Sequence, residues 1–509
     1  MNSGMLGGVT LERDVPVPMR DGIVLRADVY RPETRRDHPV LLQRNPYDKT
    51  WAQGIVFQHP AWYARHGYIV VVQDARGRFA SDGEFEPYRN EARDGADTVT
   101  WASTLPGSNG QVGTFGFSYA GATQLLAATE QPPGLRCCAP GFTGSDFYDA
   151  CTYVGGALSH AFLISWVVST LAPGDAAKRG DRVAAEALLR SATEIPSLYW
   201  TQPLRDFPLL KEAGAAPYFF DWLDHDTRDE YWRAISIADR HDRIDVPCLH
   251  YGGWYDSFIE GTLANFAGLA ERAGDDRSLA QRLVVGPWAH MPWSRVCGVR
   301  SFGEEADNRI DELQLRWFDH WLKGEPERLD EAPVSLFVMG ENRWRDADAW
   351  PPSDVRVEEW FLRSSGRALS LSGDGLLSRE GPGDEPPDVY VYLPRPPTPR
   401  RAPLRWRGAG ARRRRDERVP RGRHVVRRRG SSRCPAARLP RGVLARPAHG
   451  DGRMHGARLA PRRHRARRAR APTPSQARRG GAGAARGRPA PASAGAGPAP
   501  ARILSAHEG

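Results

Sequence analysis

The stretch Gln-Val-Gly-Thr-Phe-Gly-Phe-Ser-Tyr-Ala-Gly, residues 111–121, decides the fold class. An apolar segment typical of a strand leads into Ser118, and small residues typical of a helix follow from Tyr119 to Thr129. A serine in the sharp turn between such elements needs small neighbours, which Gly116 and Ala120 supply. The pattern is that of a nucleophile elbow, with Ala120 where glycine is usual. The alternative is a serine that only caps the following helix.

Apolar strand-like and amphipathic helix-like segments alternate on both sides of this turn. The run 67–74 is continuous and β-branched, which favours a strand buried on both faces of a parallel sheet. Asp21-Gly22 predicts a hairpin before it. The expected strands are 15–19, 23–30, 40–43, 67–74, 111–116, 135–139, 246–251 and 282–285, and the expected helices are 91–105, 119–129, 261–273 and 311–322. This order predicts α/β layering in residues 1–144 and 241–331.

A serine needs a base to remove its proton, and the base needs a carboxylate to orient it. Asp256 and His290 each follow a predicted strand, and they come after Ser118 in the order Ser, Asp, His. That is the chain order of α/β-hydrolases. We therefore predict a catalytic triad of Ser118, Asp256 and His290. The alternatives are a loop carboxylate that binds backbone N–H groups and a half-buried core histidine.

An oxyanion hole has to accompany such a triad. The backbone N–H of Tyr119 is one expected donor because it follows the nucleophile. The loop 44–49 lacks the His-Gly-Gly-Gly motif that would supply a second backbone donor. The Tyr47 hydroxyl is therefore the second candidate, and the alternative is a tyrosine packed at a loop edge. We interpret Asp74, Arg76 and Arg78 as structural.

Three regions differ from the α/β pattern. Residues 145–240 are rich in Ala, Leu, Trp and charge with helical spacing, which predicts a helical cap. Residues 332–393 carry β-type runs (334–339, 355–362, 369–371 and 389–392), which indicate an incomplete β-sandwich of jelly-roll type. Residues 394–509 contain 32 Arg, no Lys and 4 Asp or Glu, a net charge of +28 that leaves −18 for residues 1–393.

The composition of residues 394–509 predicts a disordered basic tail, because it offers little apolar surface to bury. Three interpretations stay open: an arm that binds polyanions, a plain linker, and the product of a frameshift in a GC-rich gene. The sandwich that stops near residue 393 favours the frameshift.

The remaining composition indicates compartment and partners. Six scattered cysteines without a Cys-x-x-Cys pair predict neither a disulfide framework nor a zinc site. We see no signal peptide and no run long enough to span a membrane, so we expect a cytoplasmic protein with no metal or organic cofactor. We expect no membrane partner and no nucleic acid, and a homodimer is allowed.

Several motifs together resemble the cocaine-esterase-like branch of the Xaa-Pro dipeptidyl-peptidase family of serine hydrolases. The resemblance covers about residues 10–393 and rests on segments 44–49, 73–78, 81–85, 115–121, 253–256 and 286–290. It implies that the Tyr47 hydroxyl completes the oxyanion hole. It also implies that Trp166, in a cap helix, and Phe258 line the acyl pocket, although both suit core aromatics as well.

The resemblance implies a hydrolase that acts through an acyl-enzyme on a small ester, amide or short peptide. It allows release of Xaa-Pro dipeptides, simple ester cleavage, or acylase work on β-lactam side chains. The family's third domain is a jelly roll, and only its first part is expected here. The alternative function is an impaired, truncated hydrolase whose basic tail binds polyanions.

Overall fold

The computed structural model describes residues 3–34, 36–51, 56–325, 332–389 and 444–447 of the 509-residue chain. These residues fall into two units, the first ending at Ser353 and the second beginning at Asp354. Within the described ranges, no helix combines the length and the apolar character needed to cross a bilayer.

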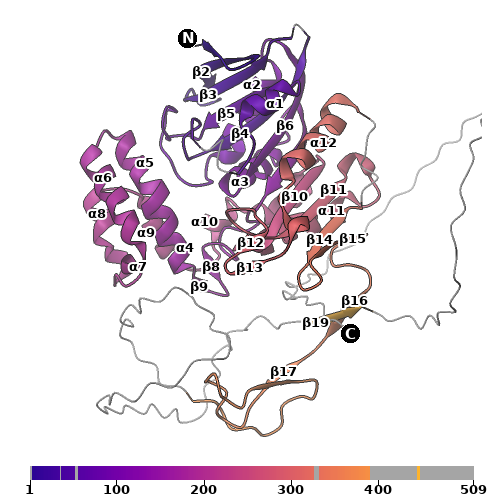
Figure 1. The fold of residues 1–509 in the computed structure, drawn as a ribbon. Helices are drawn as coiled ribbons and strands as arrows, with labels where there is room; N and C mark the ends of the chain where they lie inside the picture. The colour runs from indigo at the N-terminus through magenta and orange to yellow at the C-terminus, as the bar shows by residue number, and fades with distance from the viewer. Residues whose placement is uncertain (1–2, 35, 52–55, 326–331, 390–443, 448–509) are drawn as a thin grey trace, which may run out of the picture. The chain divides into compact units, whose positions relative to one another are not determined.

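The first unit is built on an 11-stranded sheet in the order β1-β2-β3-β5-β4-β6-β7-β10-β11-β14-β15 (Figure 1). Neighbours from β5 to β14 run parallel, and the strands outside that block pair antiparallel. The strands are β1 Ser3–Met5, β2 Val9–Pro18, β3 Val24–Pro32, β4 His38–Asn45, β5 Ile69–Asp74, β6 Ser108–Phe117, β7 Leu135–Gly141, β10 Cys248–Tyr255, β11 Gln281–Ala289, β14 Val334–Val338 and β15 Arg343–Ala347. Consecutive parallel strands bring their carboxyl ends to one edge of the sheet.

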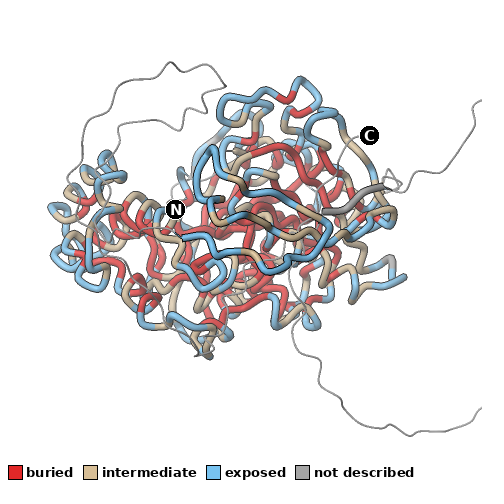
Figure 2. The backbone as a smooth tube through the Cα atoms, turned by 90° about the horizontal axis from the view of Figure 1, so that it is seen from below, coloured by how far each residue is buried: buried red, intermediate tan, exposed pale blue. Residues whose placement is uncertain are grey.

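Both faces of the sheet are buried, as the run in β5 predicts. Ile69 and Val71 pack on one side with α2 and α3, whereas Val70 and Val72 pack on the other side with α1 and α12. The helices are α1 Pro60–Arg65, α2 Glu91–Ser103, α3 Tyr119–Ala128, α11 Ile259–Ala273 and α12 Ile310–Lys323. Figure 2 shows the buried backbone running through the interior of this unit. The expected α/β-hydrolase architecture is therefore present.

The helical cap lies between β7 and β10 in the chain, and its helices form one group beside the sheet (Figure 1). It contains α4 His160–Trp166, α5 Ala172–Lys178, α6 Arg182–Ser191, α7 Ile195–Leu198, α8 Pro208–Ala213, α9 Pro217–Asp224 and α10 Glu230–Arg233, with a π-helix at Val167–Leu171 and a small hairpin of β8 Tyr153–Val154 and β9 Ala157–Leu158.

The region after residue 331 departs from the sequence prediction in two places. β14 and β15 extend the main sheet, because β14 pairs parallel with β11 from Leu283 opposite Val334 onward. The strand expected at 369–371 is wrong: these residues form bends and turns, and Leu371 is fully exposed. The two leucines, with Ser370 between them, form no strand ladder with another segment among the described residues.

The second unit contains short strands. β17 Phe361–Arg363 pairs with β18 Leu376–Ser378, and β16 Val355–Glu358 pairs with β19 Leu444–Pro447. β19 lies in the tail, where the sequence shows no alternation of apolar and polar residues and predicts no strand. Its pairing with β16 uses backbone groups, which do not require that alternation. The rest of the tail from residue 394, and most of the run 389–392, lie outside the described residues.

A buried histidine in β10 makes stability depend on pH. Burial lowers the pKa of His250 to about 4, against about 6.5 in an unfolded chain. Between these pH values the unfolded chain binds a proton at His250 that the folded chain does not. The contribution of the neutral histidine to the free energy of unfolding is therefore fully present above pH 6.5 and is lost as the pH falls toward 4. We expect wild type to lose about 2 kcal/mol more unfolding free energy than His250→Gln between pH 7 and pH 5, measured with urea. Identical pH slopes for the two proteins would contradict the prediction.

Candidate active site

Ser118 lies in a strained turn between β6 and α3. Its backbone has φ 59° and ψ −125°, which an L-residue rarely adopts. The turn also needs a glycine before it, because a Cβ on Gly116 would lie 2.7 Å from the Cβ of Ala120. Because Gly116 has no Cβ, the turn has room for the alanine methyl group at position 120, where the usual motif has glycine. Backbone strain of this kind persists only where the surrounding structure holds it.

Ser118, His290 and Asp256 form a continuous hydrogen-bonded chain. His290 Nε2 lies 3.0 Å from Ser118 Oγ, and His290 Nδ1 lies 2.8 Å from Asp256 Oδ1. The Asp256 side chain is fully buried, whereas that of His290 is 27% exposed. A buried carboxylate beside the imidazole stabilises the cation that forms when the histidine takes a proton. The Ser118 side chain makes no capping hydrogen bond to α3, and His290 is not isolated, so neither alternative accounts for the contact between them.

The sheet explains why these three residues meet. Ser118 follows β6, Asp256 follows β10 and His290 follows β11, and these strands belong to one parallel block. β10 and β11 are direct neighbours, with Gly253 opposite Gly286. The loops that leave their carboxyl ends therefore converge on the nucleophile turn.

Tyr47 and Tyr119 lie beside the nucleophile, as expected. Tyr47 is in the loop after β4, at the same edge of the sheet, and its hydroxyl lies close enough to the Ser118 side chain for the two to interact. Burial raises the pKa of Tyr47 well above its usual value, so the phenol keeps its proton and can donate it. Tyr119 is the first residue of α3, where a backbone N–H has no acceptor one turn earlier in the helix.

Buried ionic contacts hold the Tyr47 loop. Lys49 donates from its backbone N–H and its Nζ to Asp74, at 2.7 and 3.1 Å. Arg78 Nε donates to the Pro46 carbonyl at 3.0 Å. Two of the residues interpreted as structural, Asp74 and Arg78, thus hold the backbone on both sides of Tyr47, whereas Arg76 pairs with Asp94 and Asp21. Apolar strand runs that end in Asp or Arg are the only sequence signal for these contacts.

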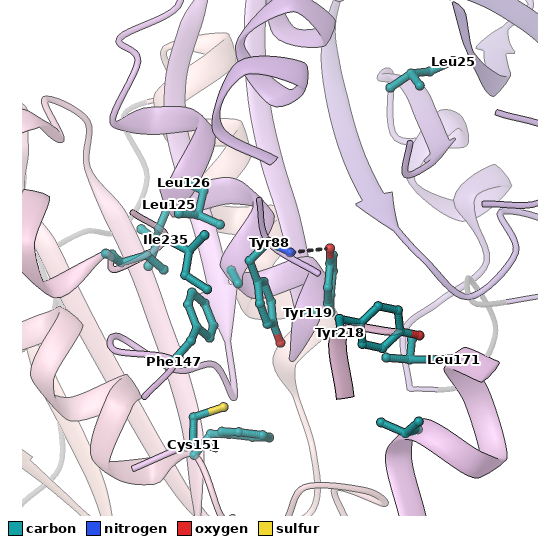
Figure 3. Packing of buried hydrophobic residues seen from close by; sticks show 14 of the residues in the cluster. Leu25, Tyr88, Tyr119, Leu125, Leu126, Phe147, Cys151, Leu171, Tyr218 and Ile235 are labelled. Atoms are coloured by element: carbon teal, nitrogen blue, oxygen red, sulfur yellow. Dashed lines mark hydrogen bonds between the residues drawn. The ribbon is translucent and has the colours of Figure 1, made fainter. Parts of the chain in front are cut away.

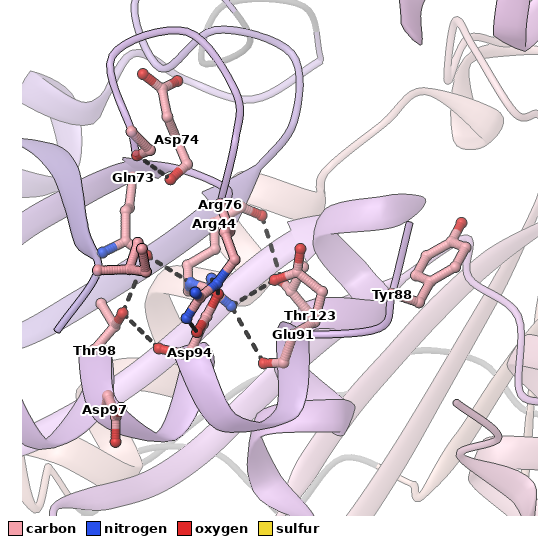
Figure 4. A network of polar contacts seen from close by, with 12 residues as sticks. Arg44, Gln73, Asp74, Arg76, Tyr88, Glu91, Asp94, Asp97, Thr98 and Thr123 are labelled. Carbon is pink, nitrogen blue, oxygen red and sulfur yellow. Dashed lines mark hydrogen bonds and ion pairs between the residues drawn. The ribbon is translucent and has the colours of Figure 1, made fainter. Parts of the chain in front are cut away.

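A second buried network, around Arg44 and Glu91 (Figure 4), reaches Tyr119 through a further hydrogen bond. Arg44 donates to Glu91 Oε2 at 2.6 Å and to Gln73 Oε1 at 2.6 Å. Glu91 Oε1 in turn accepts from the Tyr119 hydroxyl at 2.8 Å. The side chains of Arg44 and Glu91 are only 3% and 4% exposed. Sequence reasoning missed this pair, because nothing local links positions 44 and 91.

Aromatic side chains surround the triad. The Phe258 ring centroid lies 5.1 Å from that of His290 and 5.3 Å from that of Phe162. Phe162 stacks on Trp166 at 5.6 Å. Trp166 and Phe258 are thus brought together near the site, and Phe162 was not anticipated. In the core cluster, Tyr88 lies between Phe147 and Tyr119 (Figure 3), and its ring centroid is 3.8 Å from that of Phe147 and 4.5 Å from that of Tyr119.

An α/β-hydrolase fold with serine, histidine and a buried aspartate in hydrogen-bonded order is the arrangement of serine hydrolases. The family model of the X-Pro dipeptidyl-peptidase (S15 family) matches residues 21–292, and the chain belongs to this family. The family model of the X-Pro dipeptidyl-peptidase C-terminal non-catalytic domain matches residues 328–420.

Individual relatives agree with the family. The chain is 38% identical over 411 residues to cocaine esterase of Rhodococcus sp. (strain MB1 Bresler), which covers 77% of this chain and 69% of that protein. Among solved structures, an aminopeptidase from the archaeon Thaumarchaeota archaeon has a TM-score of 0.56 at 22% identity over 74% of this chain. An α-amino acid ester hydrolase has a TM-score of 0.57 at 23% identity over 74% of this chain. The chain spans less than two thirds of these two structures, 63% and 64%.

Proposed function

We propose that this chain cleaves an ester or amide of a small substrate through a covalent acyl-enzyme, with Ser118, His290 and Asp256 as the catalytic triad. The observation that carries the proposal is the 3.0 Å contact between His290 Nε2 and Ser118 Oγ, with Asp256 on the other ring nitrogen at 2.8 Å. Such an imidazole can accept the serine proton while the oxygen attacks a carbonyl carbon.

The proposed cycle has two halves. In the first, Ser118 Oγ bonds to the carbonyl carbon, and His290 passes the serine proton to the leaving alcohol or amine. In the second, His290 takes a proton from water as the water oxygen attacks the acyl carbon. The bond between that carbon and Ser118 Oγ then breaks, the carboxylic acid leaves, and the proton returns to Ser118. The Tyr47 hydroxyl and the Tyr119 N–H donate to the oxyanion in both halves.

We propose an ester with an aromatic or apolar acyl group as the substrate. Phe258, Phe162 and Trp166 form a continuous set of ring contacts that begins at His290, which suits an apolar acyl group. The similarity to a cocaine esterase supports an ester. Release of Xaa-Pro dipeptides is the second candidate, because the matching family model carries that description.

Covalent labelling tests the proposal. We expect a fluorophosphonate to label the full chain once, on the peptide that contains Ser118, as read by mass spectrometry. We expect 4-nitrophenyl benzoate to give a burst of about one nitrophenolate per chain when acyl-enzyme accumulates. Faster turnover of Gly-Pro 4-nitroanilide than of the benzoate would select the second candidate. A label on any other residue would exclude the assigned nucleophile.

A further inference from the structure

One hydrogen bond joins the cap to the oxyanion loop. The indole Nε1 of Trp166, the last residue of α4, lies 3.0 Å from the Tyr47 hydroxyl oxygen. These residues are 119 positions apart in the chain and belong to the cap and to the loop after β4. The Tyr47 hydroxyl that takes part in this bond is the one that lies beside Ser118.

The chemistry of this contact fixes the direction of a proton. An indole N–H can only donate, so the Tyr47 oxygen must accept. A phenol has a single proton, and the Tyr47 proton cannot point toward the indole N–H that donates to the same oxygen. The Tyr47 O–H then has to point elsewhere. Of the other two polar groups that act on it, Arg78 cannot accept a proton, whereas the Ser118 side chain can. The proton is thereby directed toward Ser118, the residue beside which the oxyanion of the proposed reaction would form.

The indole is itself held in place. Phe162 stacks on Trp166 with an interplanar angle of 14°, and Trp222 of α9 stacks with an angle of 7° at 5.8 Å. Parallel rings at these distances restrict rotation of the indole out of its plane. The N–H direction is therefore set by cap residues.

Arg78 joins the same two elements at the backbone. Its side chain is 1% exposed, and it donates to the Pro46 carbonyl at 3.0 Å and to the Leu171 carbonyl at 3.1 Å. It also forms an ion pair with Asp175 of α5 at 2.5 Å. One guanidinium thus links the residue before Tyr47 to the cap segment directly after Trp166. Space for it depends on Gly174, where a Cβ would lie 2.1 Å from the guanidinium.

We propose that Trp166 is a positioning residue that acts through Tyr47: its indole N–H orients the Tyr47 hydroxyl as oxyanion donor, and Arg78 holds the cap and the loop in register for that contact. This inference rests on the proposed function of the site. It gives the cap a part in the chemical step, in addition to any part in holding the acyl group.

A double-mutant cycle on the full chain tests this role. Trp166→Phe keeps a ring in place and removes only the N–H donor. We expect it to lower kcat about 10-fold, the effect of one hydrogen bond, with KM within about twofold. Tyr47→Phe is expected to lower kcat about 100- to 1000-fold, as for other lost oxyanion donors. In the Tyr47→Phe background, Trp166→Phe is expected to have no further effect on kcat.

Two further measurements separate positioning from pocket lining and from cap stability. Nitrophenyl acetate and nitrophenyl benzoate are expected to show the same loss of kcat, because the effect does not depend on acyl size. Trp232→Phe is the matched control, since it removes another cap indole bond, to the His225 carbonyl at 2.7 Å. We expect it to leave kcat unchanged.

Three results would overturn the inference. The first is a loss of kcat in Trp166→Phe that persists in full in the Tyr47→Phe background. The second is an effect of Trp166→Phe on KM for the benzoate alone, with kcat unchanged. The third is an equal loss of kcat in Trp232→Phe. Failure of the proposed function is visible separately, because wild type would then not be labelled at Ser118 by a fluorophosphonate. Labelled wild type with an additive cycle would reject the positioning role alone.

Discussion

Ser118→Ala and His290→Ala are each expected to lower kcat for nitrophenyl esters by about 10⁶-fold, and the double variant is expected to lose no more than either single one. The two residues act as a unit. Ser118 needs His290 to remove its hydroxyl proton, and without Ser118 there is no nucleophile for His290 to activate. Asp256→Asn is expected to cost about 10⁴-fold, since it leaves the imidazole in the wrong tautomer.

Steady-state kinetics on purified variants measures this effect, with circular dichroism to verify folding. Ser278→Ala and His66→Ala are matched controls at exposed positions and are expected to keep wild-type kcat. Multiplicative losses in the double variant would show that Ser118 and His290 act independently. Activity retained in Ser118→Ala would remove it from the mechanism.

Arg44→Met is expected to destabilise the protein by about 3–5 kcal/mol. Arg44 and Glu91 are both buried and 2.6 Å apart, so the variant leaves a carboxylate without its partner in the interior. Denaturant unfolding followed by tryptophan fluorescence measures the loss. Glu91→Leu in the same chain is expected to recover part of it, because the uncompensated charge is then gone.

The matched control for Arg44→Met is Arg190→Met, which breaks an ion pair with Glu186 whose side chains are both 69% exposed. Exposed pairs contribute less than about 1 kcal/mol, so this variant should unfold close to wild type. Equal losses in the two variants would contradict a stabilising role for the buried network.

The parts of the fold that follow local rules could be predicted from the sequence. β5 is recognisable because an unbroken β-branched run suits a strand covered on both faces, and the elbow is recognisable because Gly116 and Ala120 must be small. Asp256 and His290 could be found because each follows a strand in the right order. The residues expected at the site lie together for the same topological reason.

The contacts between distant segments could not be predicted. Arg44 meets Glu91, and Trp166 meets Tyr47, only after the sheet and the cap have folded. The end of the main sheet was also missed, because an isolated apolar run such as 334–338 does not show which strand it will join. The prediction for Leu369 to Leu371 failed in the opposite direction: two leucines around Ser370 suggested a strand, but the described structure gives them no strand partner.

The position of the cap between β7 and β10 makes this protein modular. Both ends of the insertion are held by neighbouring parallel strands, which pair Cys138 with Cys248 and Gly141 with Tyr251. We therefore expect a cap segment from a related enzyme, grafted at these strand ends, to alter the acyl-group preference of the proposed hydrolase. Such a graft keeps the present contacts only if it carries an indole at position 166, which meets the Tyr47 hydroxyl, and a carboxylate at position 175, which pairs with Arg78.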